Sequence, residues 1–357
     1  MFHVGYLKEV LSIMNRTLES LVVALALTST GCATTTSNSA ISTPVSGQTA
    51  DGKYDSLDNY VNIADIPRIK DANYMIISEA TYKTPDNKEI TLHSLGTGVL
   101  YKDIGTKTYL VTANHVVQND DVIQDILGRE YKKLSEKFYL LDDDQVERVQ
   151  SFLRKSSGEE SSGIFYLGNP SKKMYVSSLK NEEEMKQYIK TSAGLAAIIK
   201  VVKPQEVKVN AANDDKDLAI ISVPKLDHQS LPYSIGNSDE LQTQNLVYVV
   251  GWPLGLLKNV TRGNVTSVED SKLVRADTQT RFIFDAAISP GNSGGAIFAV
   301  RDGKFELVGL TSAMYLGSND LYIGVKINSV NEIFKGDSIR CSSGWKCNLS
   351  MPYELKL

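Results

Sequence analysis

The chain has 357 residues, of which 42% are hydrophobic and 22% are charged, as is ordinary for a soluble globular protein of one to three domains. A net charge of −4 gives no reason to expect a nucleic-acid partner. Three cysteines are too few for a disulfide framework and are not spaced as a metal site, so no metal or other cofactor is expected.

Residues 1–32 are predicted to be a targeting signal. The apolar run L-V-V-A-L-A-L is too short to span a membrane, and it leads into T-S-T-G-C, which ends at Cys32. This pattern resembles a bacterial lipoprotein signal. The resemblance implies a lipid on Cys32 that anchors the protein to a membrane and, because Ala33 follows, outer-membrane sorting on the periplasmic side. The alternative is an ordinary cleaved secretory signal with an incidental cysteine.

The remainder divides into three parts. Residues 33–72 are predicted to be a flexible tether, since Ser, Thr, Ala and Gly are frequent and no periodicity is present at its start. Residues 73–340 are predicted to be the folded domain, and 341–357 a C-terminal tail. Cys341 and Cys347 enclose S-S-G-W-K in this last region, and they either form a disulfide in an oxidising compartment or remain free thiols.

The folded domain is predicted to be all-β. Short apolar runs bounded by turn residues follow one another closely, as in a barrel or a sandwich. The strands are predicted at 74–82, 89–95, 96–101, 108–117, 196–202, 206–210, 217–223, 245–250, 262–268, 281–285, 295–300, 305–312 and 321–327.

A charged block at about 119–195 interrupts the strands and is predicted to be an insertion. Helices are predicted within it over 143–155 and 181–191, and a further short helix is predicted over 329–335. The block either shapes access to a site or is a surface elaboration without chemistry. Deletion of 122–190 without a change in peptide selectivity would contradict the first interpretation.

Ser293 is the candidate nucleophile. It stands in D-A-A-I-S-P-G-N-S-G-G-A-I-F (residues 285–298), where a Pro-Gly turn and a Gly-Gly pair enclose it between two apolar runs. Such a bend projects a hydroxyl outward and turns backbone N–H groups toward one point, which suits a nucleophile beside an oxyanion hole. The alternative is a hairpin turn with a solvated serine.

The chain offers partners for this serine. His115 follows the strand-like run in T-A-N-H-V-V, and Asp217 begins D-L-A-I-I-S-V. A serine hydroxyl needs a base, for which histidine is suited, and a carboxylate can hold the imidazole in one tautomer. Asp214 and Asp215 compete with Asp217, which is preferred because it adjoins the apolar run.

The remaining histidines lie outside these motifs. His93 and His228 are expected to be structural or exposed, and His3 falls in the predicted signal. His115, Asp217 and Ser293 follow the chain order of the chymotrypsin-type triad, which describes related enzymes and is not a result for this chain.

Six motifs in order resemble the HtrA-type branch of the trypsin-like serine proteases: T-A-N-H-V-V, D-L-A-I-I, I-G-N-S-D-E-L, G-W-P-L-G, V-T-R-G-N-V and D-A-A-I-S-P-G-N-S-G-G-A. The resemblance implies two packed six-stranded antiparallel barrels with a catalytic cleft between them. It implies His115 as base, Asp217 as orienting acid and Ser293 as nucleophile, with an oxyanion hole at Gly291, Asn292 and Ser293. Many proteins of this branch are homo-oligomers with a PDZ domain, and no PDZ domain is expected here.

The resemblance also implies a substrate pocket. Ala287 would lie at its base and Thr311, Ser312 and Ala313 along one wall, with no acidic residue to pair with Lys or Arg. We therefore expect a serine endopeptidase of the bacterial envelope that cleaves proteins or peptides after small or medium apolar residues. The alternative is a binding or chaperone-like lipoprotein on the same fold with little turnover.

Overall fold

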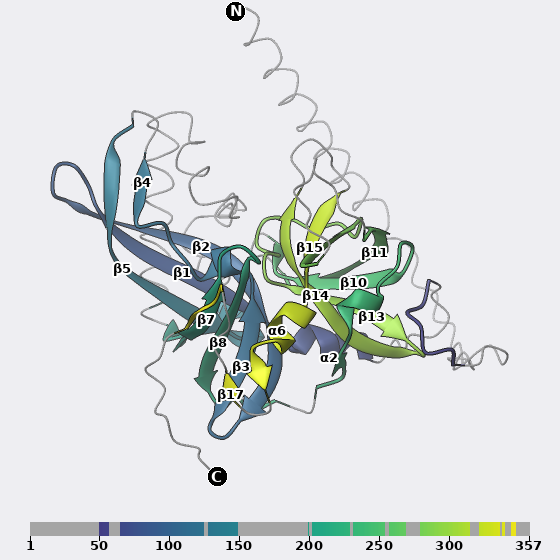
Figure 1. Cartoon of the computed structure of the whole chain (residues 1–357). Helices are drawn as coiled ribbons and strands as arrows, with labels where there is room; N and C mark the ends of the chain where they lie inside the picture. The colour runs from purple at the N-terminus through teal and green to yellow at the C-terminus, as the bar shows by residue number, and fades with distance from the viewer. Residues whose placement is uncertain are drawn as a thin grey trace, which may run out of the picture. The chain divides into compact units, whose positions relative to one another are not determined.

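The computed structural model describes residues 50–56, 65–124, 128–148, 199, 202–228, 231–253, 257–268, 279–314, 321–335, 338–339 and 344–347. All of them belong to one compact unit, Gly47–Leu357. Two mostly antiparallel β-sheets make up most of this unit (Figure 1). The predicted signal at 1–32 and the predicted helix at 181–191 lie outside the described residues.

The C-terminal sheet closes into a six-stranded barrel. In ring order its strands are β13 (Ala296–Arg301), β10 (Leu246–Gly251), β11 (Asn259–Ser267), β12 (Arg281–Phe284), β15 (Tyr322–Lys326) and β14 (Lys304–Met314). The β14 strand pairs back onto β13, so the ring has no free edge. A short seventh strand, β9 (Ser234–Ile235), pairs in parallel with β14.

Both faces of this barrel are buried. In β10, Val247 and Val249 belong to a hydrophobic cluster with Phe282 and Phe284 of β12. The alternate residues of β10, such as Val250, belong to a second cluster that contains strands of the N-terminal sheet. Successive side chains of a strand point to opposite faces, and both faces of β10 are covered by a cluster, so all six of its residues are buried.

The N-terminal sheet is longer and stays open. Its strands are β1 (Asn73–Lys83), β2 (Glu89–Ile104), β3 (Lys107–Thr112), β4 (Val122–Gln124), β5 (Glu130–Leu141), β6 (Gln205–Glu206), β7 (Lys208–Asn213), β8 (Leu218–Pro224) and β18 (Lys346–Cys347). They pair in the order β18-β7-β8-β3-β2-β1-β5-β4, with β6 on β5.

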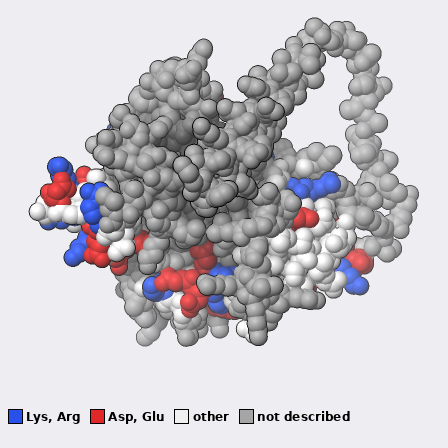
Figure 2. All heavy atoms as spheres, turned by 90° about the horizontal axis from the view of Figure 1, so that it is seen from above, with Lys and Arg blue, Asp and Glu red and all other residues white. Residues whose placement is uncertain are grey.

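Among the described residues no ladder joins the two ends of this sheet, which therefore forms a half-barrel beside the closed one. The predicted trypsin-like double-barrel fold is confirmed, with one barrel closed and the other half-formed. On the face seen in Figure 2, the acidic and basic side chains of the described residues are interspersed.

The predicted insertion begins later than expected. Residues 130–141 form β5, which pairs along most of β1 and places Phe138 and Leu140 in the core. The many charges in this stretch lie mostly on exposed positions of a strand, so charge density alone did not mark the start of the insertion. The insertion therefore starts after Leu141.

Residues 143–148 are helical, in agreement with the first part of the helix predicted at 143–155. Asp142 and Gln145 cap this helix reciprocally: the N–H of Gln145 donates to Asp142 Oδ1 at 2.7 Å, and the N–H of Asp142 donates to Gln145 Oε1 at 3.1 Å. Such a capping box marks a helix start.

One other local prediction was wrong, and the helix predicted at 329–335 is present but shorter. Ile199 and Val202 are helical, whereas 196–202 was predicted to be a strand; their spacing of three places both against one hydrophobic cluster. The helix α6 spans only Asn328–Asn331. The chain then turns into β16 (Phe334–Lys335), which pairs with β17 (Ser338–Ile339). The Phe334 ring stacks on Tyr101 at 4.9 Å.

Two parts of the predicted tether are folded. Residues 65–71 form helix α2 (Asp65–Asp71), whose Ile69 is fully buried in the large cluster. Residues 50–56 lie along the C-terminal barrel, where Tyr54 forms a β-bridge with Arg301. We call residues 50–56 the N-terminal strap.

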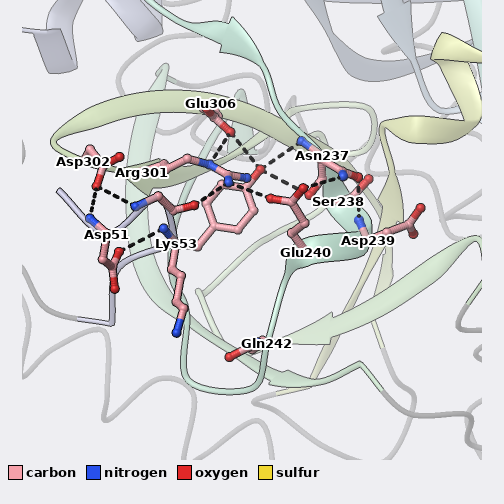
Figure 3. Close-up of polar contacts among 12 residues, drawn as sticks. Asp51, Lys53, Asn237, Ser238, Asp239, Glu240, Gln242, Arg301, Asp302 and Glu306 are labelled. Atoms are coloured by element: carbon pink, nitrogen blue, oxygen red, sulfur yellow. Dashed lines mark hydrogen bonds and ion pairs between the residues drawn. The ribbon is translucent and has the colours of Figure 1, made fainter.

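Tyr54 holds the strap in place. Its hydroxyl donates to Glu306 Oε2 at 2.8 Å and accepts from the N–H of Asn237 at 2.9 Å. Arg301 lies over its ring at 4.1 Å and forms ion pairs with Glu240 and Glu306 (Figure 3). Burial, the first of several causes, raises the pKa of Tyr54 to about 12, so the phenol remains protonated at neutral pH.

No helix in the described ranges has the length and apolar character needed to cross a membrane.

Candidate active site

Strand pairing brings His115 and Asp217 together. His115 lies in the short turn η1 (Asn114–Val116) directly after β3, and Asp217 directly precedes β8. The two strands are antiparallel neighbours, with Thr112 opposite Ala219. The end of one strand therefore meets the start of the other, although the two side chains are 102 residues apart in the chain.

His115 and Asp217 are directly hydrogen-bonded. Nδ1 of His115 lies 2.8 Å from Oδ2 and 2.9 Å from Oδ1 of Asp217, and the backbone N–H of His115 donates to Oδ1 at 3.0 Å. A carboxylate only accepts hydrogen bonds, so Nδ1 carries the proton and Nε2 is left as the basic nitrogen. The side chains are 23% and 15% exposed, so the pair is sheltered but accessible.

Asp217 is held as an anion. Burial acts to raise its pKa, but the charge of His115 and the hydrogen bonds from His115 and Ser312 outweigh burial and keep the pKa below its ordinary value. The Ser312 hydroxyl donates to Oδ2 at 2.6 Å. The carboxylate is therefore ionised at neutral pH and suited to stabilise an imidazolium.

The contacts described for the two competing aspartates are with residues other than His115. Asp214 accepts from Nδ2 of Asn114 at 2.8 Å and forms an ion pair with Lys346 at 2.6 Å. The described bond of Asp215 is through its backbone carbonyl, which accepts from Arg281 at 3.0 Å. Of the three aspartates, Asp217 is the one that contacts His115.

Ser293 lies in the turn between β12 and β13. Gly291 and Gly294 have φ values of 98° and 79°, which side chains other than glycine rarely adopt. The N–H of Gly294 donates to the carbonyl of Thr311 at 2.7 Å, and the hydroxyl of Thr311 donates to the carbonyl of Asn292. The nucleophile loop, residues 289–295, is thereby fixed to β14 of the closed barrel.

The same loop also contacts the N-terminal sheet. Thr97 of β2 donates its backbone N–H to the carbonyl of Ser293 at 2.8 Å and its hydroxyl to the carbonyl of Gly291 at 2.9 Å. A Cβ on Gly294 would collide with Thr112 and Ala113, which immediately precede η1. The loop of Ser293 and the segment of His115 therefore lie side by side.

Two backbone donors of the nucleophile loop are left over. Among the described residues, the N–H groups of Gly291 and Ser293 have no acceptor, whereas the N–H of Asn292 donates to Ser289 at 3.0 Å. Gly291 and Ser293 thus fit the predicted oxyanion hole, and the N–H of Asn292 is used within the turn. The Asn292 side chain is buried, and its Oδ1 lies against Gly251 without a hydrogen-bond partner in the described part.

The four residues of the predicted substrate pocket differ in exposure. Ala287 and Ala313 are exposed, as a pocket lining requires. Thr311 is fully buried and Ser312 is bonded to Asp217, so their side chains support the site and do not face a substrate. The layout of the resembled family assigned all four residues to one pocket.

The other predicted residues lie apart from this site. His93 is buried with Nε2 3.1 Å from Glu79, and His228 lies 3.2 Å from Asp103. Within the described ranges no group of three His, Cys, Asp or Glu residues is placed to hold a metal.

Cys347 is disulfide-bonded. Cys32 and Cys341 lie outside the described residues. The Cys341–Cys347 pairing therefore stays a prediction, which a mass shift on reduction would test.

A comparison with known families decides the affiliation. The profile of the trypsin-like peptidase domain matches residues 96–310, which is more than half of the chain and includes His115, Asp217 and Ser293. The chain belongs to the trypsin-like peptidase family.

Named relatives of this trypsin-like peptidase are similar over shorter stretches. A "Probable periplasmic serine endoprotease DegP-like" of Chlamydia pneumoniae is 40% identical over 110 residues, which are 30% of this chain and 21% of the relative. A protein of the same name from Pseudomonas putida (strain F1) is 31% identical over 149 residues, 39% of this chain and 29% of the relative. The chain thus spans between a fifth and a third of the length of these relatives.

Solved structures are also similar. The "HtrA-type protease AlgW with tripeptide" is 19% identical with a TM-score of 0.41, and the similarity covers 75% of this chain and 60% of that one. The "HtrA-type protease AlgW with decapeptide" is 17% identical with a TM-score of 0.43, and the similarity covers 75% of this chain and 64% of that one.

Sequence reasoning missed two supporting residues of this trypsin-like peptidase. Thr97 stands in G-T-G, a motif that carried no site assignment, and Ser312 was assigned to the pocket. Ser312 bonds to Asp217, 95 positions away, and Thr97 bonds to Gly291, 194 positions away. Nothing in the local sequence indicates either bond. Only the strand pairing brings these hydroxyls to Asp217 and Gly291.

Proposed function

We propose that this chain is a serine endopeptidase. The observation that carries the proposal is the hydrogen-bonded pair of His115 and Asp217 beside a glycine-rich loop that presents Ser293 and two backbone N–H groups without acceptors among the described residues. Proteins or peptides are the proposed substrates, in keeping with the names of the similar proteins.

The acylation step uses each of these groups. Oγ of Ser293 attacks the carbonyl carbon of the scissile peptide bond, and its proton passes to Nε2 of His115. Asp217 stabilises the imidazolium that forms. The N–H groups of Gly291 and Ser293 bind the oxygen of the tetrahedral intermediate, where each such donor is worth about 3–4 kcal/mol in comparable sites.

The same groups complete the cycle. Acylation ends when the tetrahedral intermediate collapses, the leaving amine takes the proton from His115 and an ester to Ser293 remains. In deacylation water attacks the ester and His115 accepts its proton, and His115 returns that proton to Oγ of Ser293 as the acid product leaves. The balance of protons needs only water besides the groups of the chain.

A fluorophosphonate probe and casein digestion test the proposal together. We expect the wild type to be labelled and to cleave casein, and Ser293→Ala to do neither. The matched control is Ser289→Ala, which changes a serine of the same loop and retains labelling. Absence of labelling and of cleavage in the wild type would contradict the proposal and favour a binding or chaperone-like protein of the same fold.

We further propose a preference for small or medium apolar residues at P1. Ala287 and Ala313 are exposed and carry no charge, and no acid is assigned to the pocket. A peptide library should show cleavage after Val or Ala. A clear preference for Arg over Val would contradict this specificity.

The proposed location is the bacterial envelope, with a lipid anchor on Cys32 and the domain facing the periplasm. The similar proteins named as periplasmic endoproteases support the compartment, and the T-S-T-G-C pattern supports the anchor. Fractionation and palmitate labelling of the wild type and Cys32→Ala test it. A Cys32→Ala variant that remains in the membrane fraction and is labelled equally would contradict the anchor. Light scattering of the purified protein tests the expected homo-oligomer.

A further inference from the structure

We propose that Thr97 is a positioning residue for the oxyanion hole, an inference that rests on the proposed function. Thr97 lies on β2, in the opposite sheet from the nucleophile loop, and is fully buried. It bonds to two carbonyls of the loop around the serine, those of Gly291 and Ser293.

The direction of each oxyanion donor depends on the peptides next to it. The carbonyls that Thr97 binds belong to the peptides 291–292 and 293–294, which are planar and lie on either side of the peptide that carries the N–H of Ser293. The peptide between Gly291 and Asn292 is held by the Thr97 hydroxyl on one side and by Ser289 on the other. Gly291 has φ of 98°, and glycine crosses between backbone regions readily. Rotation at Gly291 would redirect its own N–H, and the Thr97 bond opposes that rotation.

The hydroxyl of Thr97 can point in only one way. It lies 3.2 Å from the backbone N–H of Trp252, which can only donate. Because the hydroxyl oxygen accepts the Trp252 N–H, its single proton is available to donate to the carbonyl of Gly291. The β-branched side chain has few alternative χ1 rotamers, so this direction is well fixed.

Trp252 connects the same hydroxyl to the insertion. The Trp252 ring packs in a cluster with Val146 and Ile199, one from each described end of the insertion. Lys258 lies over the ring at 5.2 Å and pairs with Asp143 at 2.6 Å. Residues of the insertion thus pack against Trp252, whose backbone N–H donates to the Thr97 hydroxyl. None of these residues takes part in the proposed chemistry itself.

Thr108 offers a matched control. It is a fully buried threonine of β3 whose hydroxyl also donates one bond, to Asp103 at 2.6 Å, and accepts one backbone N–H, from Leu226 at 3.0 Å. Thr108→Val, like Thr97→Val, removes one donated and one accepted hydrogen bond of a buried hydroxyl, although its acceptor is a carboxylate, and does so away from the nucleophile loop.

The experiment compares Thr97→Val, Thr97→Ser and Thr108→Val in the full chain, with a peptide p-nitroanilide that has Val at P1 and with casein. For Thr97→Val we expect kcat to fall about 10- to 100-fold with KM within about threefold, because oxyanion donors act in the transition state. Thr97→Ser keeps the hydroxyl and should recover kcat to within about threefold of wild type. Thr108→Val should lose stability without losing kcat.

Equal kcat in Thr97→Val and wild type, or an equal loss of kcat in Thr108→Val, would overturn the proposal. Hydrogen exchange of the 289–295 loop separates this failure from that of the proposed function. Thr97→Val should accelerate exchange in the loop and Thr108→Val should not, whether or not the wild type cleaves peptides. Unchanged exchange in Thr97→Val would overturn the positioning role on its own.

Discussion

The closed C-terminal barrel and the open N-terminal half-barrel contribute different kinds of residue to one site. The closed barrel carries Ser293 on a loop whose peptides are bonded to β14. The half-barrel carries His115 and Asp217 at the meeting ends of β3 and β8. A ring without free edges gives the loop a rigid base, whereas the open sheet ends at β18 on one side and at β4 and β6, which both pair with β5, on the other.

The difference also concerns how each half is supported. The Asp217 carboxylate of the half-barrel is bonded by Ser312 of the closed barrel, and the Gly291 carbonyl of the closed barrel is bonded by Thr97 of the half-barrel. Each half therefore orients a group of the other. The site depends on the pairing of the two sheets as well as on the three side chains.

The largest expected effect comes from removing the reactive side chain that each half contributes. Ser293→Ala and His115→Ala should each lower kcat about 10⁵- to 10⁶-fold, and the double variant should lose little more, because the two groups act as a unit. Steady-state kinetics on the Val p-nitroanilide measure this. His228→Ala is the histidine control. A double variant whose loss equals the product of the single losses would show that the two halves act independently.

The second effect lies within the half-barrel. Asp217→Asn should lower kcat about 10⁴-fold, the scale known for this replacement in a chymotrypsin-type protease, because the amide no longer fixes the tautomer. Asp214→Asn should remain within about threefold of wild type, since Asp214 bonds to Asn114 and Lys346. The reverse order of the two variants would refute the choice of Asp217.

A third prediction tests the closed barrel by stability alone. Tyr54→Ala should lower the free energy of unfolding by about 3–5 kcal/mol, because it removes the buried ring of the N-terminal strap. Tyr54→Phe should cost about 1–2 kcal/mol, since it removes only the hydroxyl between Glu306 and Asn237. Urea unfolding measures both. A large loss of kcat in Tyr54→Phe would show that the strap also controls the site.

A fourth prediction concerns pH. The pKa of Asp217 is lowered in the folded state, so the folded state binds this proton less tightly than the unfolded state. Its contribution to stability is present above the ordinary pKa of 3.8 and is lost as the pH falls through the folded pKa. Urea midpoints between pH 7 and pH 3 should show a difference between wild type and Asp217→Asn that narrows at acidic pH. A constant difference would contradict the assignment.

The smallest effect is expected at the insertion. Val146 is 2% exposed and packs under Trp252, so Val146→Ala should lower the free energy of unfolding by about 1–2 kcal/mol. Through Trp252 it should also lower kcat about two- to threefold. Glu147→Ala, on the same helix, is the surface control. If Val146→Ala lowers the stability but leaves kcat unchanged, the insertion has a structural role only.

The sequence by itself indicated the fold class and the chemistry. Strand runs with turn residues predicted an all-β domain, the family resemblance predicted the double barrel, which is confirmed, and the glycines around Ser293 predicted the turn. These features are local, because a strand, a glycine turn and a reactive side chain are each encoded by a few neighbouring residues. Family resemblance also supplied the grouping of His115, Asp217 and Ser293.

The tertiary structure decided which residues support that group and where each sheet ends. The charged stretch of β5 is a strand because β1 pairs with it. Residues 199 and 202 are helical because their side chains then pack together against the Trp252 cluster. Thr97 and Ser312 reach their partners across the two sheets. Such contacts depend on which strands become neighbours, a property of the whole chain that no short stretch of residues encodes.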